Sequence, residues 1–151
     1  MEQIRNYTGY GVQGSNYNSK LSLKDIAKLI RGQLKKEFPT CKFSVVTEYY
    51  SMGCSLHVSL MESPFKVSKD ENFNGHLQLN EYQFINESEV ERQINNGYKI
   101  TPQLFYIMNK VVYIINSYNY NDSDPQIDYF DTNFYLHLNV GKWDKPYRQI
   151  N

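Results

Sequence analysis

The segment from Leu21 to Leu60 constrains the fold more than any other part of the chain. Ser22 and Asp25 form a capping-box pattern, which predicts the start of a helix. Apolar residues then recur at helical spacing, at Leu23, Ile26, Ala27, Ile30 and Leu34. Pro39 cannot continue a helix, so we expect the helix to stop at the Phe38-Pro39 pair. The segment therefore opens with one amphipathic helix that ends abruptly.

Two alternating segments follow the proline and predict a β-hairpin. The first places Phe43, Val45 and Thr47 on one face, and the second places Cys54, Leu56, Val58 and Leu60 on one face. Matching the two apolar faces puts Val45 opposite Val58 and leaves a four-residue loop from Tyr50 to Gly53. Gly53 can adopt a positive φ in such a loop.

The rest of the chain adds shorter elements and a second long helix. A short strand is expected within His76 to Phe84. A capping-box pattern at Ser88 predicts a short helix that ends near Asn96. A long helix is expected to begin at Thr101-Pro102. A last strand alternates from Phe134 to Val140. The predicted fold class is α+β: an antiparallel sheet of three or more strands with two main helices packed on one face. The predicted order is helix, strand, strand, short helix, helix, strand.

The length and composition favour one folded unit, because 151 residues with 40% hydrophobic content can bury a core without metals or disulfides. We expect residues 1–20 to be an extended N-terminal arm, residues 21–142 a single α+β domain, and residues 143–151 a C-terminal tail. Trp143, together with Tyr147 in that tail, could anchor an interface or equally cap the core.

Charge is distributed unevenly along the chain, although the net charge is zero. From Lys20 to Lys42 there are seven basic and two acidic residues, whereas Phe43 to the end has eight basic and thirteen acidic residues. Four of the basic residues fall in one stripe of the first helix: Lys24, Lys28, Arg31 and Lys35. This stripe is either a solvated face or a surface for phosphates or an acidic partner. No aromatic residues interleave with it, which favours a binder of protein or nucleoprotein over an autonomous nucleic-acid binder.

A second candidate surface lies in the loop before the last strand, where four aspartates cluster. They are Asp122, Asp124, Asp128 and Asp131. These carboxylates could imitate phosphates or bind a cation, but their spacing does not match an EF-hand loop and Asp is common in turns.

Two histidine motifs lie in predicted strands, at His57-Val58-Ser59 and His137-Leu138-Asn139. Two converging H-x-[ST] strands are typical of two-histidine phosphoesterases, in which one His acts as general base and the other as general acid. Here Asn139 cannot supply the second hydroxyl, and no basic residue flanks either motif. A phosphoesterase is therefore the alternative function, and surface histidines are the plainer explanation.

The remaining residues point to a cytoplasmic protein without cofactor or metal. Cys41 and Cys54 fall at opposite ends of the predicted hairpin, so they are expected to be free thiols in a reducing compartment. No apolar segment is long enough to span a bilayer, and the first twenty residues do not look like a secretory signal.

The opening segments resemble a large-polyvalent-protein-associated domain of phages and plasmids. The likeness lies in Ile26-Ala27-Lys28-Leu29-Ile30-Arg31, in Leu34 to Pro39 and in Lys42 to Val45. The end of that domain is similar to Asp128-Tyr129-Phe130-Asp131, Asn133 to Tyr135 and Val140-Gly141. This resemblance implies a mobile-element protein without established catalytic residues.

The chain also resembles the small phage-encoded inhibitors of CRISPR nucleases, in particular staphylococcal inhibitors of Cas9. That likeness rests on size, composition and the shared opening. It implies a non-enzymatic partner-binding protein whose partner is a bacterial CRISPR effector nuclease, alone or with its guide RNA. The sequence does not determine the oligomeric state, and a monomer is the default expectation. A generic interaction module of a mobile element is a further possibility.

Overall fold

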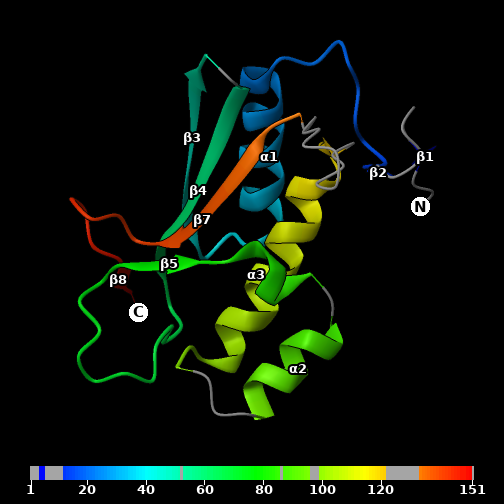
Figure 1. Cartoon of the computed structure of the whole chain (residues 1–151). Coiled ribbons are helices and arrows are strands. Elements are labelled where there is room, and N and C mark those ends of the chain that lie inside the picture. The colour runs from blue at the N-terminus through cyan, green and yellow to red at the C-terminus, as the bar shows by residue number, and fades with distance from the viewer. Residues whose placement is uncertain are drawn as a thin grey trace.

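The computed structural model describes residues 4–5, 12–51, 53–85, 87–95, 99–121 and 133–150. Its main sheet has the strand order β3-β4-β7-β5, and β8 pairs with the end of β4 (Figure 1). These strands are β3 (Lys42–Tyr50), β4 (Gly53–Ser63), β5 (Leu77–Leu79), β7 (Tyr135–Val140) and β8 (Arg148–Gln149). The helices are α1 (Leu23–Glu37), α2 (Glu87–Asn95), α3 (Pro102–Asn116) and the 3-10 helix η1 (Glu81–Phe84). The predicted α+β class is confirmed.

The first helix begins and ends where the sequence predicts. The Ser22 side chain accepts a hydrogen bond from the Asp25 backbone N–H at 3.1 Å, and the Asp25 carboxylate accepts one from the Ser22 N–H at 3.1 Å. This reciprocal capping box satisfies two N–H groups that lack partners within the helix. The helix ends at Glu37, and Phe38 closes its last turn.

The hairpin also forms as predicted, with Val45 opposite Val58. The ladder continues one pair further than the predicted four-residue loop allows, because Tyr50 pairs with Gly53. Gly53 has a φ of +148°, a conformation that is open to glycine because it has no Cβ. The positive φ predicted for Gly53 is confirmed, and the loop length is corrected.

The sheet is mixed, so the prediction of an antiparallel sheet is wrong for one pair of strands. β7 runs parallel to β4, whereas β3 pairs antiparallel with β4 and β5 antiparallel with β7. The physical reason is the long crossover between β4 and β7, which contains η1, α2 and α3 and returns the chain to the end where β4 starts. Alternation of apolar and polar residues is the same in parallel and antiparallel strands, so it did not reveal the direction.

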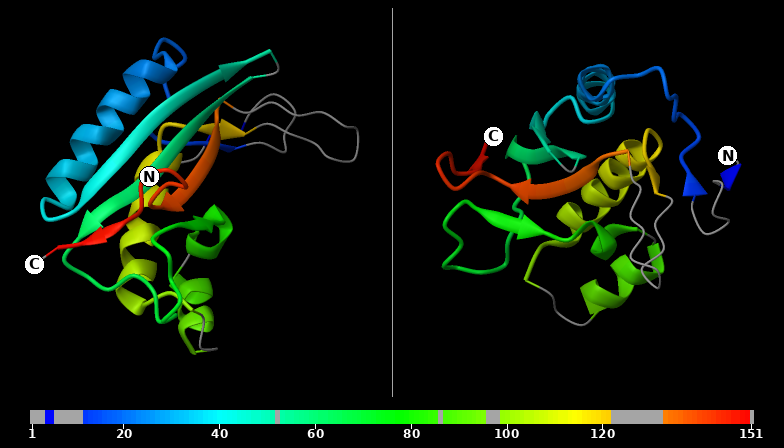
Figure 2. Two further views of the ribbon diagram at one scale, coloured as in Figure 1. Left: turned by 90° about the vertical axis from the view of Figure 1, so that its left-hand side faces the viewer. Right: turned by 45° about the horizontal axis from the view of Figure 1, so that its top comes forward.

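Both long helices cover one face of the sheet, as predicted (Figures 1 and 2). The core between the two layers contains apolar residues from α1, α3 and the inner positions of the strands: Ile26, Ile30, Leu34, Leu104, Phe105, Met108, Val111, Ile115, Leu56, Val58, Leu60, Leu138 and Val140. The smaller helices η1 and α2 pack against α3 and against each other. Ser88 lies within α2, which already begins at Glu87, so the predicted N-cap at Ser88 is wrong.

Thr101 caps α3 as expected, and its hydroxyl accepts a hydrogen bond from the Leu104 N–H. Pro102 follows at the first helical position, where its missing N–H costs nothing.

The described parts of both termini return to the body of the protein. A small second sheet joins β1 (Ile4–Arg5), β2 (Val12–Gln13) and β6 (Tyr120–Asn121) in the order β1-β2-β6. Near it, the Gly14 N–H donates to the Asn119 carbonyl at 2.8 Å. At the other terminus, β8 pairs with β4 next to the close contact between the hydroxyls of Tyr147 and Ser63 at 2.6 Å. Tyr147 is therefore held against the sheet.

Candidate functional site

The outer face of the sheet, opposite α1 and α3, brings the two histidine motifs together. His57 and His137 are direct neighbours in the parallel ladder between β4 and β7, and Ser59 and Asn139 form the next pair on the same face. The two imidazole rings stack with their centroids 4.6 Å apart and their planes 12° from parallel. The convergence on which the phosphoesterase alternative depends is therefore present.

Glu48 is the third member of this group. The Nε2 atom of His57 lies 2.9 Å from a carboxylate oxygen of Glu48, which is on the neighbouring strand β3. The contact is largely solvent-exposed, so it contributes little to stability. Chemically, it occupies Nε2, so a proton taken from a substrate by His57 would go to Nδ1.

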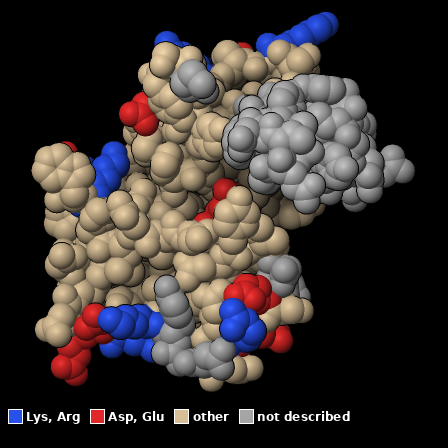
Figure 3. Space-filling model, in the orientation of Figure 1, with Lys and Arg blue, Asp and Glu red and all other residues tan. Residues whose placement is uncertain are grey.

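Along the described strands, the outer face around the histidine pair offers hydroxyl and amide groups and neither Lys nor Arg. The outer-face positions of the described strands are Ser44, Val46, Glu48, Tyr50, Ser55, His57, Ser59, Met61, Gln78, Tyr135, His137 and Asn139. None of them is Lys or Arg. Figure 3 shows this side of the molecule, where most of the visible charged side chains lie towards the periphery. A phosphate at the pair would therefore depend on histidine protonation for its counter-charge.

The basic stripe of α1 is present, but its four members are not equivalent. Lys24, Lys28 and Lys35 are exposed. Arg31 is exposed too, but its Nη2 donates to the backbone carbonyl oxygen of Val45 in β3 at 2.7 Å. One of the predicted partner-binding residues therefore has a structural role, because it satisfies a backbone group of the sheet.

The other predicted partner-binding residues divide into two groups. Trp143 is 86% exposed in the turn between β7 and β8, so it does not cap the core and is available as an interface anchor. The aspartates Asp122, Asp124, Asp128 and Asp131 lie outside the described residues. Their role remains a prediction.

Two asparagines that the sequence analysis did not single out hold the chain on either side of the aspartate segment. The amide of Asn119 donates to the Phe134 carbonyl at 2.9 Å, and its oxygen accepts from the Phe134 N–H at 3.2 Å. The amide of Asn133 donates to the Tyr118 carbonyl at 3.2 Å. These contacts bring residues 118–121 and 133–134 side by side. No local sequence pattern predicts these contacts, because the paired residues lie 15 positions apart in the sequence.

An exposed aromatic group on α3 and η1 was also missed. Tyr82 and Tyr113 are each 65% exposed, and Tyr106 is 51% exposed. The signal was available, since Tyr106 and Tyr113 are seven residues apart on the helix side that the apolar stripe does not use. Amphipathic aromatics of this kind are favoured in interfaces.

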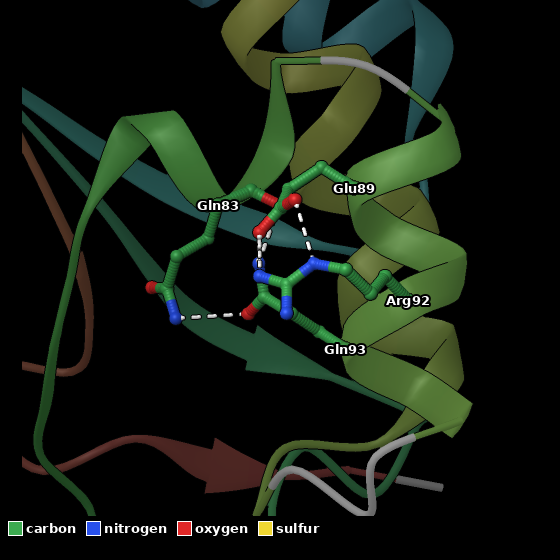
Figure 4. Close-up of polar contacts among 4 residues, drawn as sticks. All are labelled: Gln83, Glu89, Arg92 and Gln93. Atoms are coloured by element: carbon green, nitrogen blue, oxygen red, sulfur yellow. Dashed lines mark hydrogen bonds and ion pairs between the residues drawn. The ribbon is translucent and has the colours of Figure 1, made fainter.

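A polar cluster of two charged and two amide side chains connects α2 to η1 (Figure 4). Gln93, which is 7% exposed, donates to Glu89 at 2.9 Å and accepts from the Gln83 amide at 3.1 Å. Arg92 binds the Glu89 carboxylate through two nitrogens, at 2.6 and 3.0 Å. The hydrogen bond from Arg92 is the main reason why the pKa of Glu89 is lowered. The cluster is a structural connection.

A pocket of about 450 Å³ lies between residues 66–75 and the C-terminal residues 146–149. Its lining mixes Lys66 with Asp70 and Glu71, next to the aromatic rings of Phe73 and Tyr147. Charges of both signs at its wall give no preference for an anion or a cation, and we assign no ligand to it.

Thiol and metal chemistry find little support among the described residues. Cys41 and Cys54 are both free, and burial raises the pKa of each thiol, which lowers its reactivity. Across the described ranges, no group of three or more His, Cys, Asp and Glu side chains is arranged to hold a metal ion. In the same ranges, no helix has both the length and the apolar character needed to cross a bilayer.

Comparison with known proteins gives one match. The family described as large polyvalent protein associated domain 29 matches residues 21–121. The match contains α1, the Phe38-Pro39 junction and the hairpin, which carry the opening part of the predicted resemblance. It ends before Asp128, so the predicted similarity of the closing segments stays a prediction. No curated protein and no solved structure matches the chain.

Proposed function

The chain belongs to the family of large polyvalent protein associated domain 29, a module associated with phages and mobile elements, and on this premise we propose that it works by binding a protein of the bacterial host. The observation that carries the proposal is the family match over the helix, junction and hairpin. The exposed side chains suit binding better than chemistry. Trp143 and the tyrosines Tyr82, Tyr106 and Tyr113 offer aromatic anchors.

The partner that we propose is a Cas9-type CRISPR effector, alone or with its guide RNA, and the proposed outcome is a block of DNA binding or cleavage. What supports this finer step is the resemblance in size, composition and opening segment to small phage inhibitors of CRISPR nucleases. The candidate contact surfaces are the basic stripe of α1, the aspartate segment and Trp143.

The test is a cleavage assay with purified Cas9, guide RNA and a target plasmid. Addition of the protein in molar excess should abolish cleavage, and affinity-tagged protein should retain Cas9 from a lysate after nuclease treatment. Trp143→Ala should weaken the retention of Cas9. The control Gln103→Ala, which changes an exposed residue of α3, should not. Full cleavage in the presence of a large excess of folded protein would rule out the Cas9-inhibitor proposal.

A second candidate function is a phosphoesterase, favoured by the stacked pair of His57 and His137. Under our proposal, incubation with cyclic nucleotides or cyclic oligonucleotides yields no product. Turnover that disappears in both His57→Ala and His137→Ala would establish the enzyme instead. A rate that also falls in Glu48→Gln would add that the carboxylate orients the His57 ring for catalysis.

A further inference from the structure

The free edge of β3 is the starting point for a more specific statement about the partner. In the described part of the chain, β3 pairs with β4 on one side only. In an antiparallel pair, alternate residues turn their N–H and C=O groups away from the neighbouring strand. At the end of a sheet these groups can receive another strand, and proteins usually protect them.

Protection covers only the first half of this edge. The register between β3 and β4 shifts at Lys42 and Phe43, and such an irregularity disfavours pairing. Arg31 is exposed and still reaches the Val45 carbonyl, so this carbonyl points away from β4 and is blocked by the guanidinium. Thr47 and Tyr49 alternate with Val45 and share its outward direction. Within the described part of the chain, the backbone groups of these two residues make no hydrogen bond beyond β4.

The basic stripe of α1 runs along this same edge. Its four members span about 60° of the helix circumference at about 100° per residue. Arg31 fixes the direction of the stripe, since it reaches β3, while Gln33 lies on the opposite flank and accepts a hydrogen bond from Tyr118 at 2.7 Å. The stripe therefore lies on the flank of α1 that faces the free edge.

Two lysines of the stripe lie beside the open half of β3. α1 and β3 run in opposite directions (Figure 1), so residues before Arg31 lie alongside residues after Val45. Lys24 precedes Arg31 by about 10 Å of helix rise, and Glu48 follows Val45 by about 10 Å of strand. Lys24 and Lys28 are therefore level with the part of β3 that contains Thr47 and Tyr49.

We propose that the β3 edge from Val46 to Tyr50, together with Lys24 and Lys28, binds an extended acidic segment of a partner protein, which adds to the sheet as a further strand. The statement rests on the proposed function only in taking the ligand to be a protein. Side chains of an added strand alternate between the two faces of the sheet. Those on the α1 side meet two lysines, and those on the other side lie beside Val46 and Tyr50, which are 45% and 44% exposed.

This geometry predicts the residue pattern of the partner segment and disfavours two other ligands, a second copy of the chain and a nucleic acid. The partner segment should alternate acidic with apolar residues, with backbone bonds giving affinity and the lysines giving specificity. A second copy of the chain would bring two basic stripes together on the same face of a continuous sheet, which is repulsive. A nucleic acid could contact the lysines but has no backbone amides for the strand edge.

The test uses the full-length protein and a labelled, end-blocked eight-residue peptide that alternates Glu with Val. Fluorescence anisotropy should show saturable binding. Lys24→Ala/Lys28→Ala should weaken it at least tenfold, and the matched control Lys36→Ala/Lys110→Ala, which removes two exposed lysines away from the edge, should leave it unchanged. Thr47→Pro should abolish binding, because it removes an outward N–H while a proline is tolerated on an edge strand.

A measurement on the wild-type protein makes the test independent of folding in the variants. The amides of Thr47 and Tyr49 should exchange with solvent more slowly when the peptide is bound, by NMR. No change in their exchange at saturating peptide, equal binding of a Lys-for-Glu peptide, or displacement of the peptide by oligo-dT with the same lysine dependence would each overturn the proposal. Concentration-dependent dimerisation that is lost in Thr47→Pro would assign the edge to a second copy instead.

The outcomes also separate this proposal from the proposed function. Cas9 inhibition that survives in folded Thr47→Pro and Lys24→Ala/Lys28→Ala proteins would remove the strand-addition site and leave the inhibitor function intact. If the peptide binds with the expected variant pattern but the protein does not affect Cas9, the strand-addition site is supported and the Cas9-inhibitor function is rejected.

Discussion

Replacing Thr101 with valine should destabilise the protein well beyond what a surface substitution does. Thr101 is 6% exposed and caps α3. Its Oγ1 accepts from the Leu104 N–H at 3.3 Å and donates to the Lys66 carbonyl at 2.6 Å. One hydroxyl therefore starts the long helix and ties it to the segment that follows β4. Valine has nearly the same shape, so the substitution removes the polar contacts without opening a cavity.

The size of the effect follows from these two contacts. Loss of an N-cap costs typically about 1 kcal/mol. Leaving the Lys66 carbonyl without its partner in a part-buried position adds about 1–2 kcal/mol. The expected loss in the free energy of unfolding is therefore about 2–3 kcal/mol, equivalent to a fall in Tm of roughly 5–10 °C for a chain of this length.

Urea unfolding followed by far-UV circular dichroism measures this loss as a lower midpoint at unchanged slope. Thr101→Ser keeps the hydroxyl and should lose much less. Ser22→Ala removes the exposed cap of α1 and should cost no more than about 1 kcal/mol. If Thr101→Val lost under about 0.5 kcal/mol, or if serine were as damaging as valine, the hydroxyl would not have the role that we assign to it.

Three further predictions concern two glycines and a thiol. Gly141→Ala should lower the free energy of unfolding by at least about 2 kcal/mol, because the φ of +66° disfavours a side chain and the new Cβ would collide with the Gly75 carbonyl. A variant as stable as the wild type in urea unfolding would contradict this. Gly32→Ala, in the open middle of α1, should instead raise stability by about 0.5–1 kcal/mol in the same urea assay. Burial raises the pKa of Cys41, so its thiolate fraction at any pH is lower than in the unfolded chain. Its alkylation by iodoacetamide, followed by mass spectrometry, should therefore accelerate at higher pH in the native than in the urea-unfolded protein, and identical profiles would refute the burial argument.

The elements that could be predicted from the sequence are those fixed by local chemistry. The capping box at Ser22, the stop at Phe38-Pro39 and the Thr101-Pro102 start of α3 each act within a few residues, and all three appear in the structure. The hairpin register with Val45 opposite Val58 was also accessible, because matching two apolar faces leaves few alternatives. The start of α2 at Glu87 was missed, since the Ser88 pattern offered a competing cap.

The candidate sites depended more on distant contacts. The two histidine motifs were visible in the sequence, but only the parallel pairing of β4 with β7 stacks the His57 and His137 rings. Likewise, Arg31 belongs to the basic stripe by its spacing, while its bond to Val45 shows that it protects the sheet edge. Spacing along a helix shows on which face a residue lies, but it does not show which residue of a neighbouring strand or helix its side chain contacts.

The sequence by itself determined the α1 helix, the hairpin, the apolar faces that form the core and the charge of the helix stripe. Local capping, periodicity and composition act between near neighbours and need no knowledge of the rest of the chain. Only the tertiary structure decided the direction of β7, the meeting of the histidines and which flank of α1 faces the edge of β3. Each of these depends on how a long crossover or a helix packs across the sheet, where burial of the whole core, and not any local preference, selects the arrangement.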